Sequence, residues 1–301
     1  MLNVKYIIGV DGGGTKTTAV LADEGGGILS IGKGGPSNIR NVGLEVAVDN
    51  IFNAIKEVKK EENVSCYCIA LASVEEEQEV KKEAIIRMLK EKGLEGEIFI
   101  ESDQLSAFKA GTDENDGVVI IAGTGAVCRG WRSYKEHKTS GWGYLAGEGS
   151  AFYAGIETYR AVQKSFDGRG EKTKMEEILK EEWGVESASD FNKKIYPNFM
   201  EALPQLSIVL DRAEQQGDYV ARNILEKISD ELFLSAKTVI EKLDFRKVKF
   251  PVVLSGGMFK SDLLKESLSN KILMFVPKVE VIILKEDPVK GAVKMAMRFD
   301  N

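Results

Sequence analysis

Apolar and polar residues repeat with two different periods along the chain, and the change of period predicts an α/β protein. Runs of β-branched and aromatic residues indicate strands, and stretches with an apolar residue at every third or fourth position indicate helices. The first third of the chain therefore contains expected strands at Tyr6–Val10, Thr17–Leu21, Ile28–Ile31, 66–72 and 97–101, and expected helices at 44–61, 76–92 and 103–111.

The rest of the chain repeats this order and adds a long helical insertion. A polar break, residues 114–117, precedes the repeat. We expect strands at Val118–Ala122, Ala126–Trp131, 139–142, 252–254 and 279–284, helices from 149 to 245, and further helices at 260–269 and 288–298. Both halves begin with a strand, a Gly/Thr turn and a returning strand. The pattern thus indicates an internal duplication, with both turns facing one cleft between two α/β domains.

The first Gly/Thr turn lies in VDGGGTKTTAVLAD, residues 10–23, and has features of a phosphate-binding loop. It is not a P-loop, because Thr15 stands where that loop has its lysine and the following residues predict a strand instead of a helix. Consecutive backbone N–H groups of a glycine-rich hairpin still bind phosphate, since no Cβ blocks the approach. For three glycines alone, an ordinary hairpin turn is the alternative.

Composition limits the classes of function. A chain of 301 residues with 43% hydrophobic and 29% charged residues is typical of one large or two medium globular domains. The net charge of −6 argues against a general nucleic-acid-binding surface. No apolar run approaches the ~18 residues of a membrane helix, and the start MLNVKYIIGVD predicts a strand and not a signal peptide. We therefore expect a cytoplasmic protein with no membrane partner.

Cysteine and histidine are scarce. Cys66 and Cys68 are two positions apart in an expected strand and so point to one face, and Cys128 stands alone; buried structural cysteines are the simplest interpretation. The single histidine, His137, lies in a polar stretch that predicts a solvated turn. A catalytic triad or a histidine-rich metal site is thereby excluded. Catalysis must depend on carboxylates, hydroxyls, backbone amides and a bound cation.

Six segments in a fixed order give the chain a resemblance to a known group. They are DGGGTKT, ESDQLSA, IAGTGAVCRGW, GWGYLAGEGSAF, QQGDYVA and VVLSGGMFKSDLL. Together they resemble the actin/hexokinase/heat-shock-protein-70 ATPase superfamily and, within it, the N-acetylglucosamine kinase branch that also holds activator ATPases of benzoyl-CoA reductase and 2-hydroxyacyl-CoA dehydratases. The resemblance implies two actin-like (ribonuclease H-like) α/β domains with an ATP cleft between them, at 1–115 plus 287–301 and at 116–286.

The resemblance also implies which residues bind ATP and Mg²⁺. Asp11 would hold Mg²⁺ through water, which suits a metal that dehydrates reluctantly. The two Gly/Thr turns would hold the phosphates, and a glycine-rich turn near residue 256 would border the nucleoside. The implied ATP-binding residues are Gly12, Gly13, Gly14, Thr15, Lys16, Gly123, Thr124, Gly125, Gly217, Gly256, Gly257 and Ser261. For Gly217, placed near the adenine, a plain turn glycine is the alternative.

Asp103 matches the position of the family's catalytic base. It follows an expected strand and opens an expected helix, so Ser102 or Asp103 would also serve as an ordinary N-cap. In the family the carboxylate at this position faces the acceptor hydroxyl and accepts its proton during attack on the γ-phosphorus. We expect the base, with a mere cap as the alternative.

The acceptor side departs from the family pattern at one place. The substrate-binding residues implied by the resemblance are Asn38, Asp103, Gly141, Trp142, Gly143, Tyr144, Leu145 and Glu148. Trp142 is equally compatible with a core position. The family loop G-D-E-G-S binds sugar hydroxyls through its aspartate, whereas this chain has only Glu148. That loss suits a sugar with a substituent on O3, such as N-acetylmuramic acid, whose lactyl carboxylate would pair with Arg40.

These features predict an ATP-dependent, Mg²⁺-requiring kinase for the 6-hydroxyl of an N-acetylated amino sugar, N-acetylglucosamine or N-acetylmuramic acid, in cell-wall or chitin salvage. Two alternatives remain: an activator ATPase that shares a [4Fe–4S] cluster across a dimer, and a nucleotide-sensing or chaperone-like ATPase. A glucosamine kinase is a further variant of the first prediction. The charged region 165–215 predicts a solvated helical insertion, and we expect a homodimer.

Overall fold

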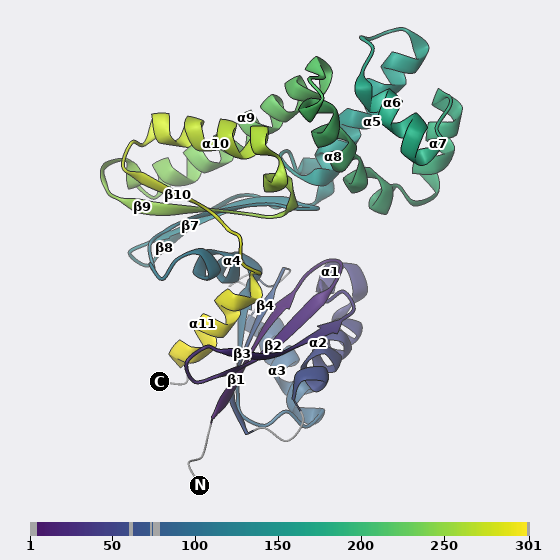
Figure 1. Ribbon diagram of the computed structural model, residues 1–301. Helices are drawn as coiled ribbons and strands as arrows, with labels where there is room; N and C mark the ends of the chain where they lie inside the picture. The colour runs from purple at the N-terminus through teal and green to yellow at the C-terminus, as the bar shows by residue number, and fades with distance from the viewer. Residues whose placement is uncertain (1–4, 60–62, 73, 75–78, 300–301) are drawn as a thin grey trace. The chain divides into compact units, whose positions relative to one another are not determined.

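The computed structural model describes residues 5–59, 63–72, 74 and 79–299 and divides into two compact units (Figure 1). One unit comprises Met1–Glu114 and Leu284–Asn301, and the other comprises Asn115–Ile283. The C-terminal segment thus returns to the unit in which the chain begins. Within the described residues, no helix is long and apolar enough to span a membrane.

The first unit is built on a five-stranded mixed sheet in the order β3-β2-β1-β4-β5. The strands are β1 (Tyr6–Gly12), β2 (Thr17–Asp23), β3 (Ile28–Gly34), β4 (Val64–Leu71) and β5 (Glu97–Ser102). β1, β2 and β3 pair in antiparallel fashion, while β4 and β5 run parallel to β1. The glycines at 12–14 are followed by a strand, as expected, so the P-loop alternative is excluded by the structure as well.

Helices cover both faces of this sheet, because both faces are apolar (Figure 1). The helices are α1 (Ile39–Val42), α2 (Leu44–Val58), α3 (Glu79–Glu91), α4 (Asp103–Gly111) and α11 (Val289–Phe299). Ile8 and Val10 of β1 face α2 and α3, whereas Ile7 faces α11. α4 and α11 are packed together: Ser106 donates to the Pro288 carbonyl at 2.7 Å, and a Cβ on Gly291 would lie 1.8 Å from the Ser106 oxygen.

The second unit repeats the topology of the first. Its sheet has the order β10-β9-β6-β7-β8, with β6, β7 and β8 antiparallel and β9 and β10 parallel to β6. The strands are β6 (Gly117–Ala122), β7 (Ala126–Arg132), β8 (Lys135–Ser140), β9 (Phe250–Ser255) and β10 (Val279–Ile283). β6 takes the place of β1 and β9 that of β4. The internal duplication expected from the sequence is therefore confirmed.

The helical region between β8 and β9 is confirmed as well. It contains α5 (Ala151–Asp167), α6 (Lys174–Trp183), α7 (Ala188–Ile195), α8 (Phe199–Gln215) and α9 (Tyr219–Lys242), and α10 (Asp262–Phe275) follows β9. The insertion is less solvated than its charge suggested, because Met175, Phe191 and Leu206 are completely buried in the core of this unit.

Three local expectations differ from the structure. His137 lies in strand β8, paired with Gly130, and not in a solvated turn; β8 spans Lys135–Ser140 where we expected 139–142. The turn lies at Ser133 and Tyr134, both at positive φ, as a two-residue hairpin requires. The short helix α1 was not expected, and residues 60–61 and 76–78 of the expected helices lie outside the described residues.

Cys66 and Cys68 lie on one face of β4, as their spacing predicted, and Cys128 lies in β7. All three thiols are buried in the cores of the two units. Burial raises the pKa of Cys68 well above its usual range, because it disfavours the thiolate. These cysteines behave as small apolar core residues.

Candidate functional site

The first Gly/Thr turn joins β1 to β2 and is closed by a hydrogen bond from the Gly13 amide to the Lys16 carbonyl at 3.0 Å. Gly12 is required by packing, since a Cβ there would lie 2.4 Å from the Leu71 and Ser37 side chains. Packing does not require a glycine at position 14, because the atom nearest to a Cβ there would be 3.7 Å away. With the Gly13 amide engaged inside the turn, an anion would be bound by the Gly14 and Thr15 amides.

This turn is fastened to the segment Gly35–Asn38. The Gly13 carbonyl accepts from the amides of Ser37 at 3.0 Å and Asn38 at 3.2 Å. Beneath it, the buried Thr17 hydroxyl bonds to the Gly35 carbonyl at 2.7 Å and to the Ser37 hydroxyl at 2.8 Å. The predicted phosphate turn and the segment that carries Asn38 therefore form one hydrogen-bonded structure.

We expect Thr17→Val to lower the free energy of unfolding by about 1–3 kcal/mol, because it leaves the buried Ser37 hydroxyl and Gly35 carbonyl without their partner. Thermal denaturation followed by circular dichroism measures the change. Thr238→Val is the matched control, since Thr238 bonds only to the Leu234 carbonyl of its own helix at the solvent-exposed surface. Equal melting temperatures for the two variants would contradict the expectation.

Asn38 and Arg40 lie at the start of α1. The Asn38 side-chain oxygen caps this helix by accepting from the Arg40 amide at 3.0 Å. An acceptor bound by Asn38 would therefore meet its side-chain NH₂ group. Arg40 is exposed to solvent.

Asp11, Asp103 and Asp287 lie around the carboxyl end of the first sheet, on the side where α4 and α11 begin. Asp11 is the next-to-last residue of β1, Asp103 directly follows the last residue of β5, and Asp287 lies two residues before α11. Burial first, and then the negative charges of Asp103 and Asp287, raise the pKa of Asp11 from 3.8 to about 7, while the positive charge of Lys16 opposes them. Asp103 and Asp287 are therefore both close enough to Asp11 for their charges to act on its carboxyl group.

Asp103 is the first residue of α4 and is not its cap. Ser102 is the N-cap, and its hydroxyl accepts from the Leu105 amide at 3.2 Å. The alternative in which Asp103 is only an N-cap is therefore wrong. The Asp103 carboxylate instead accepts a hydrogen bond at 2.7 Å from the side chain of Gln104.

Two residues at this site were not singled out by the sequence: Asp287, which immediately precedes the expected helix 288–298, and Gln104. Asp287 does cap, accepting from the Val289 amide at 3.1 Å, but its charge also acts on Asp11. The sequence DPVKGA, residues 287–292, indicates only the start of a helix and gives no sign that Asp287 acts on Asp11. Among the described residues, no three His, Cys, Asp or Glu side chains are close enough to form a complete metal site.

The second Gly/Thr turn joins β6 to β7 and is fixed by the start of α5. The Gly123 amide donates to the Gly125 carbonyl at 2.9 Å, and the Gly123 carbonyl accepts from the Ala151 amide at 2.8 Å. Open space surrounds the Cβ positions of both glycines, with nothing within 4 Å. An anion at this turn would meet the amides of Thr124 and Gly125.

The loop before α5 presents aromatic and apolar side chains to solvent. Trp142 is 70% exposed and Leu145 is 89% exposed, so a core position for Trp142 is excluded. The Lys138 ammonium lies 4.5 Å from the centre of the Trp142 ring. Glu148 is exposed, and Tyr144 packs against Phe152 of α5. Gly141 and Gly143 adopt positive φ, which shapes the loop.

The turn after β9 lies against the second Gly/Thr turn. A Cβ on Gly256 would lie 2.4 Å from the Ala122 carbonyl oxygen and 2.9 Å from the Gly123 amide, so only glycine fits. Gly257 has open space around its Cβ position. Ser261 is buried and caps α10 by accepting from the Leu264 amide. The structure thus brings two of the predicted ATP-binding segments together.

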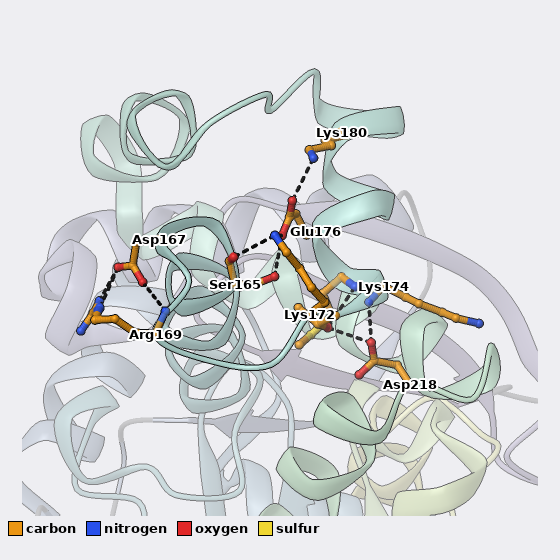
Figure 2. Close-up of polar contacts among 10 residues, drawn as sticks. Ser165, Asp167, Arg169, Lys172, Lys174, Glu176, Lys180 and Asp218 are labelled. Atoms are coloured by element: carbon orange, nitrogen blue, oxygen red, sulfur yellow. Dashed lines mark hydrogen bonds and ion pairs between the residues drawn. The ribbon is translucent and has the colours of Figure 1, made fainter.

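Gly217 occupies the tight turn between α8 and α9, with a φ of 82°. The next residue, Asp218, caps α9 through the Ala221 amide at 2.7 Å and also accepts from the Thr173 hydroxyl at 2.8 Å. Figure 2 shows Asp218 and, nearby, the buried Glu176 with Ser165, Lys172 and Lys180. Gly217 therefore has a clear structural role, and its contact with adenine stays a prediction.

Two curated relatives match nearly the full chain. The N-acetylmuramic acid/N-acetylglucosamine kinase of Clostridium acetobutylicum is 31% identical, over 97% of this chain and 98% of the relative. The N-acetyl-D-glucosamine kinase of Dictyostelium discoideum is 30% identical, over 98% of this chain and 99% of the relative.

A solved structure shows the same architecture. The crystal structure of a proposed N-acetylglucosamine kinase from Porphyromonas gingivalis has a TM-score of 0.72 at 18% identity and covers 97% of this chain and 98% of that one. At this identity the likeness concerns the fold, which is the two-domain, actin-like fold of sugar kinases. The sequence pattern of one family matches residues 8–296, and the chain belongs to that family, the BadF/BadG/BcrA/BcrD ATPase family.

Proposed function

We propose that this protein is an ATP-dependent kinase that phosphorylates the 6-hydroxyl of an N-acetylated amino sugar, N-acetylglucosamine or N-acetylmuramic acid. The observation that carries the proposal is the placement of Asp103. Ser102 is the N-cap of α4, and the charge of Asp103 acts on Asp11, which adjoins the first Gly/Thr turn. Both curated relatives named above are kinases of such sugars.

The proposed reaction needs a base, an aligned acceptor and neutralised phosphate charge. Asp103 takes the proton of the sugar 6-hydroxyl as that oxygen forms a bond to the γ-phosphorus. The bond between the γ-phosphorus and the β,γ-bridging oxygen breaks, and ADP leaves with the bonding electron pair. The first turn would bind phosphate through the Gly14 and Thr15 amides, and Lys16 beside it supplies a positive charge.

The residues around Asp11 fit a magnesium ion. A carboxyl whose pKa is about 7 in the presence of two further carboxylates is a place where a divalent cation relieves repulsion. Asp11 would hold the ion through water, and the bound ion would offset the charge of the phosphates. In this proposal Asp103 accepts the proton of the sugar hydroxyl and does not hold the ion.

The second unit would contribute phosphate and nucleoside contacts through Gly123–Gly125, Gly256, Gly257 and Ser261, with Gly217 at the adenine. The exposed ring of Trp142 offers an aromatic surface for a sugar face. Arg40 is exposed and would pair with the lactyl carboxylate of N-acetylmuramic acid, and Glu148 would take the place of the missing family aspartate.

An activator ATPase is the second candidate, because the chain belongs to the BadF/BadG/BcrA/BcrD ATPase family. Their function requires cysteines that can ligate a cluster shared between two subunits. Here Cys66, Cys68 and Cys128 lie in the cores, remote from solvent, which favours the kinase. A homodimer and a cytoplasmic location, where ATP is supplied, complete the proposal.

The test is ATP-dependent ADP release with N-acetylglucosamine, N-acetylmuramic acid, glucosamine, glucose or no acceptor. We expect the two N-acetylated sugars to stimulate turnover well above the blank, and the product to be the 6-phosphate by NMR. Equal ADP release with and without sugar would favour the activator or sensor alternatives. Phosphorylation of N-acetylglucosamine but not N-acetylmuramic acid would contradict the role of Arg40.

A further inference from the structure

Gln104 follows Asp103 in the first turn of α4, and the residue is 7% exposed. Its Nε2 atom lies 2.7 Å from Oδ1 of Asp103, a good distance for a hydrogen bond in which the amide donates to the carboxylate. A glutamine in the first turn of a helix is ordinarily a surface residue, and burying its amide is costly unless the amide is hydrogen-bonded.

This hydrogen bond is not needed to begin the helix. Ser102 caps α4 through the Leu105 amide, and the helix packs on α11 through Ser106 and the Pro288 carbonyl. The terminal torsion of an aspartate is broad, so the plane of its carboxylate depends on the groups bonded to it. A buried donor on Oδ1 fixes the plane of the carboxylate, and a hydrogen bond to an ionised group is stronger than one between neutral groups.

We propose that Gln104 is a positioning residue for the base: it orients the Asp103 carboxylate toward the acceptor hydroxyl. This inference rests on the proposed function, because it assumes that Asp103 accepts the sugar proton. In this proposal Gln104 acts on the reaction through its hydrogen bond to Asp103.

A double-mutant cycle tests the inference. Gln104→Met keeps the length and volume of the side chain but removes the donor, and it is compared with wild type, Asp103→Asn and the double variant. Gln163→Met is the matched control, because the Gln163 amide also donates to a side-chain oxygen at 2.7 Å, that of Asn192 in the helical insertion. Sugar-dependent ADP release gives kcat and KM for each variant, and thermal melting reports whether each is folded.

We expect Gln104→Met to lower kcat by roughly 10-fold, with both KM values nearly unchanged, since a carboxylate that is no longer held in place transfers the proton less often. In the Asp103→Asn background the same change should lower kcat by less than about 2-fold, because the residue it acts on is already absent. Gln163→Met should match wild type.

Two results overturn the inference alone. Wild-type kcat for Gln104→Met would show that the hydrogen bond does not matter, and an equal loss of kcat in both backgrounds would show a merely structural role. If the wild-type enzyme shows no sugar-dependent turnover, the proposed function fails and the inference fails with it.

Discussion

Asp103→Asn is expected to lower kcat for sugar phosphorylation by roughly 10²–10⁴-fold while the protein stays folded. The amide has the size of the carboxylate but cannot accept the hydroxyl proton. Folding should be preserved, because Ser102 and not Asp103 caps α4. Since the acceptor and ATP are bound chiefly by other groups, the KM for ATP should change little. Coupled ADP-release assays at saturating sugar measure the effect.

Asp190→Asn is the matched control for this variant. Asp190 also lies in the first turn of a helix, α7, behind a serine cap, Ser187, but in the helical insertion of the other unit. It should retain wild-type kcat. Near-normal turnover in a folded Asp103→Asn protein would remove Asp103 from the role of base, and with it the main support for the acceptor site.

Much of the fold could be predicted because its signals are local. The strands at Tyr6–Gly12 and Gly117–Ala122 are indicated by short runs rich in Ile and Val, and the glycine-containing turn after each indicates a hairpin. The β7–β8 hairpin could not be predicted, since its turn uses Ser133 and Tyr134 at positive φ where glycine or asparagine is usual. His137 was therefore assigned to a turn instead of to an edge strand.

Site residues that lie within a sequence motif could be predicted. Site residues that come together only through the tertiary fold could not. Asp11 and Asp103 follow strands in recognisable segments. The influence of Asp287 on Asp11 depends on the return of α11 to the first sheet, where Ser106 meets the carbonyl of Pro288, 182 residues away. Gln104 gave no signal either, because only the structure shows that its amide is buried against a carboxylate.

Asp11→Asn is expected to stabilise the ligand-free protein above pH 7 and to impair the enzyme. The pKa of Asp11 is raised from 3.8 to about 7, by burial first and by Asp103 and Asp287 next. Below about pH 4 the residue is protonated in the folded and unfolded chains alike, so it has no effect. As the pH rises toward 7, the unfolded chain loses this proton and the folded chain retains it, so wild-type stability falls.

Asparagine does not ionise, so the free energy of unfolding of the variant does not fall in this way as the pH rises. Allowing for partial exposure of the carboxyl, we expect a gain of about 1–3 kcal/mol in the free energy of unfolding at pH 8 and none at pH 4. Thermal melts of both proteins in EDTA at the two pH values measure it. The same variant should need more Mg²⁺ and lose roughly 10–100-fold in activity, since the water-mediated hold on the ion is weakened.

The two measurements on Asp11→Asn separate two meanings of a raised pKa. A buried acid of purely structural origin would give the stability gain with no change in Mg²⁺ dependence. If Asp11 also holds the metal ion, Asp11→Asn changes both the stability and the Mg²⁺ dependence. The repulsion between carboxylates that destabilises the ligand-free protein is the repulsion that a divalent cation relieves. Unchanged melting temperatures at pH 8 would contradict the electrostatic account, and unchanged Mg²⁺ dependence would remove Asp11 from the metal site.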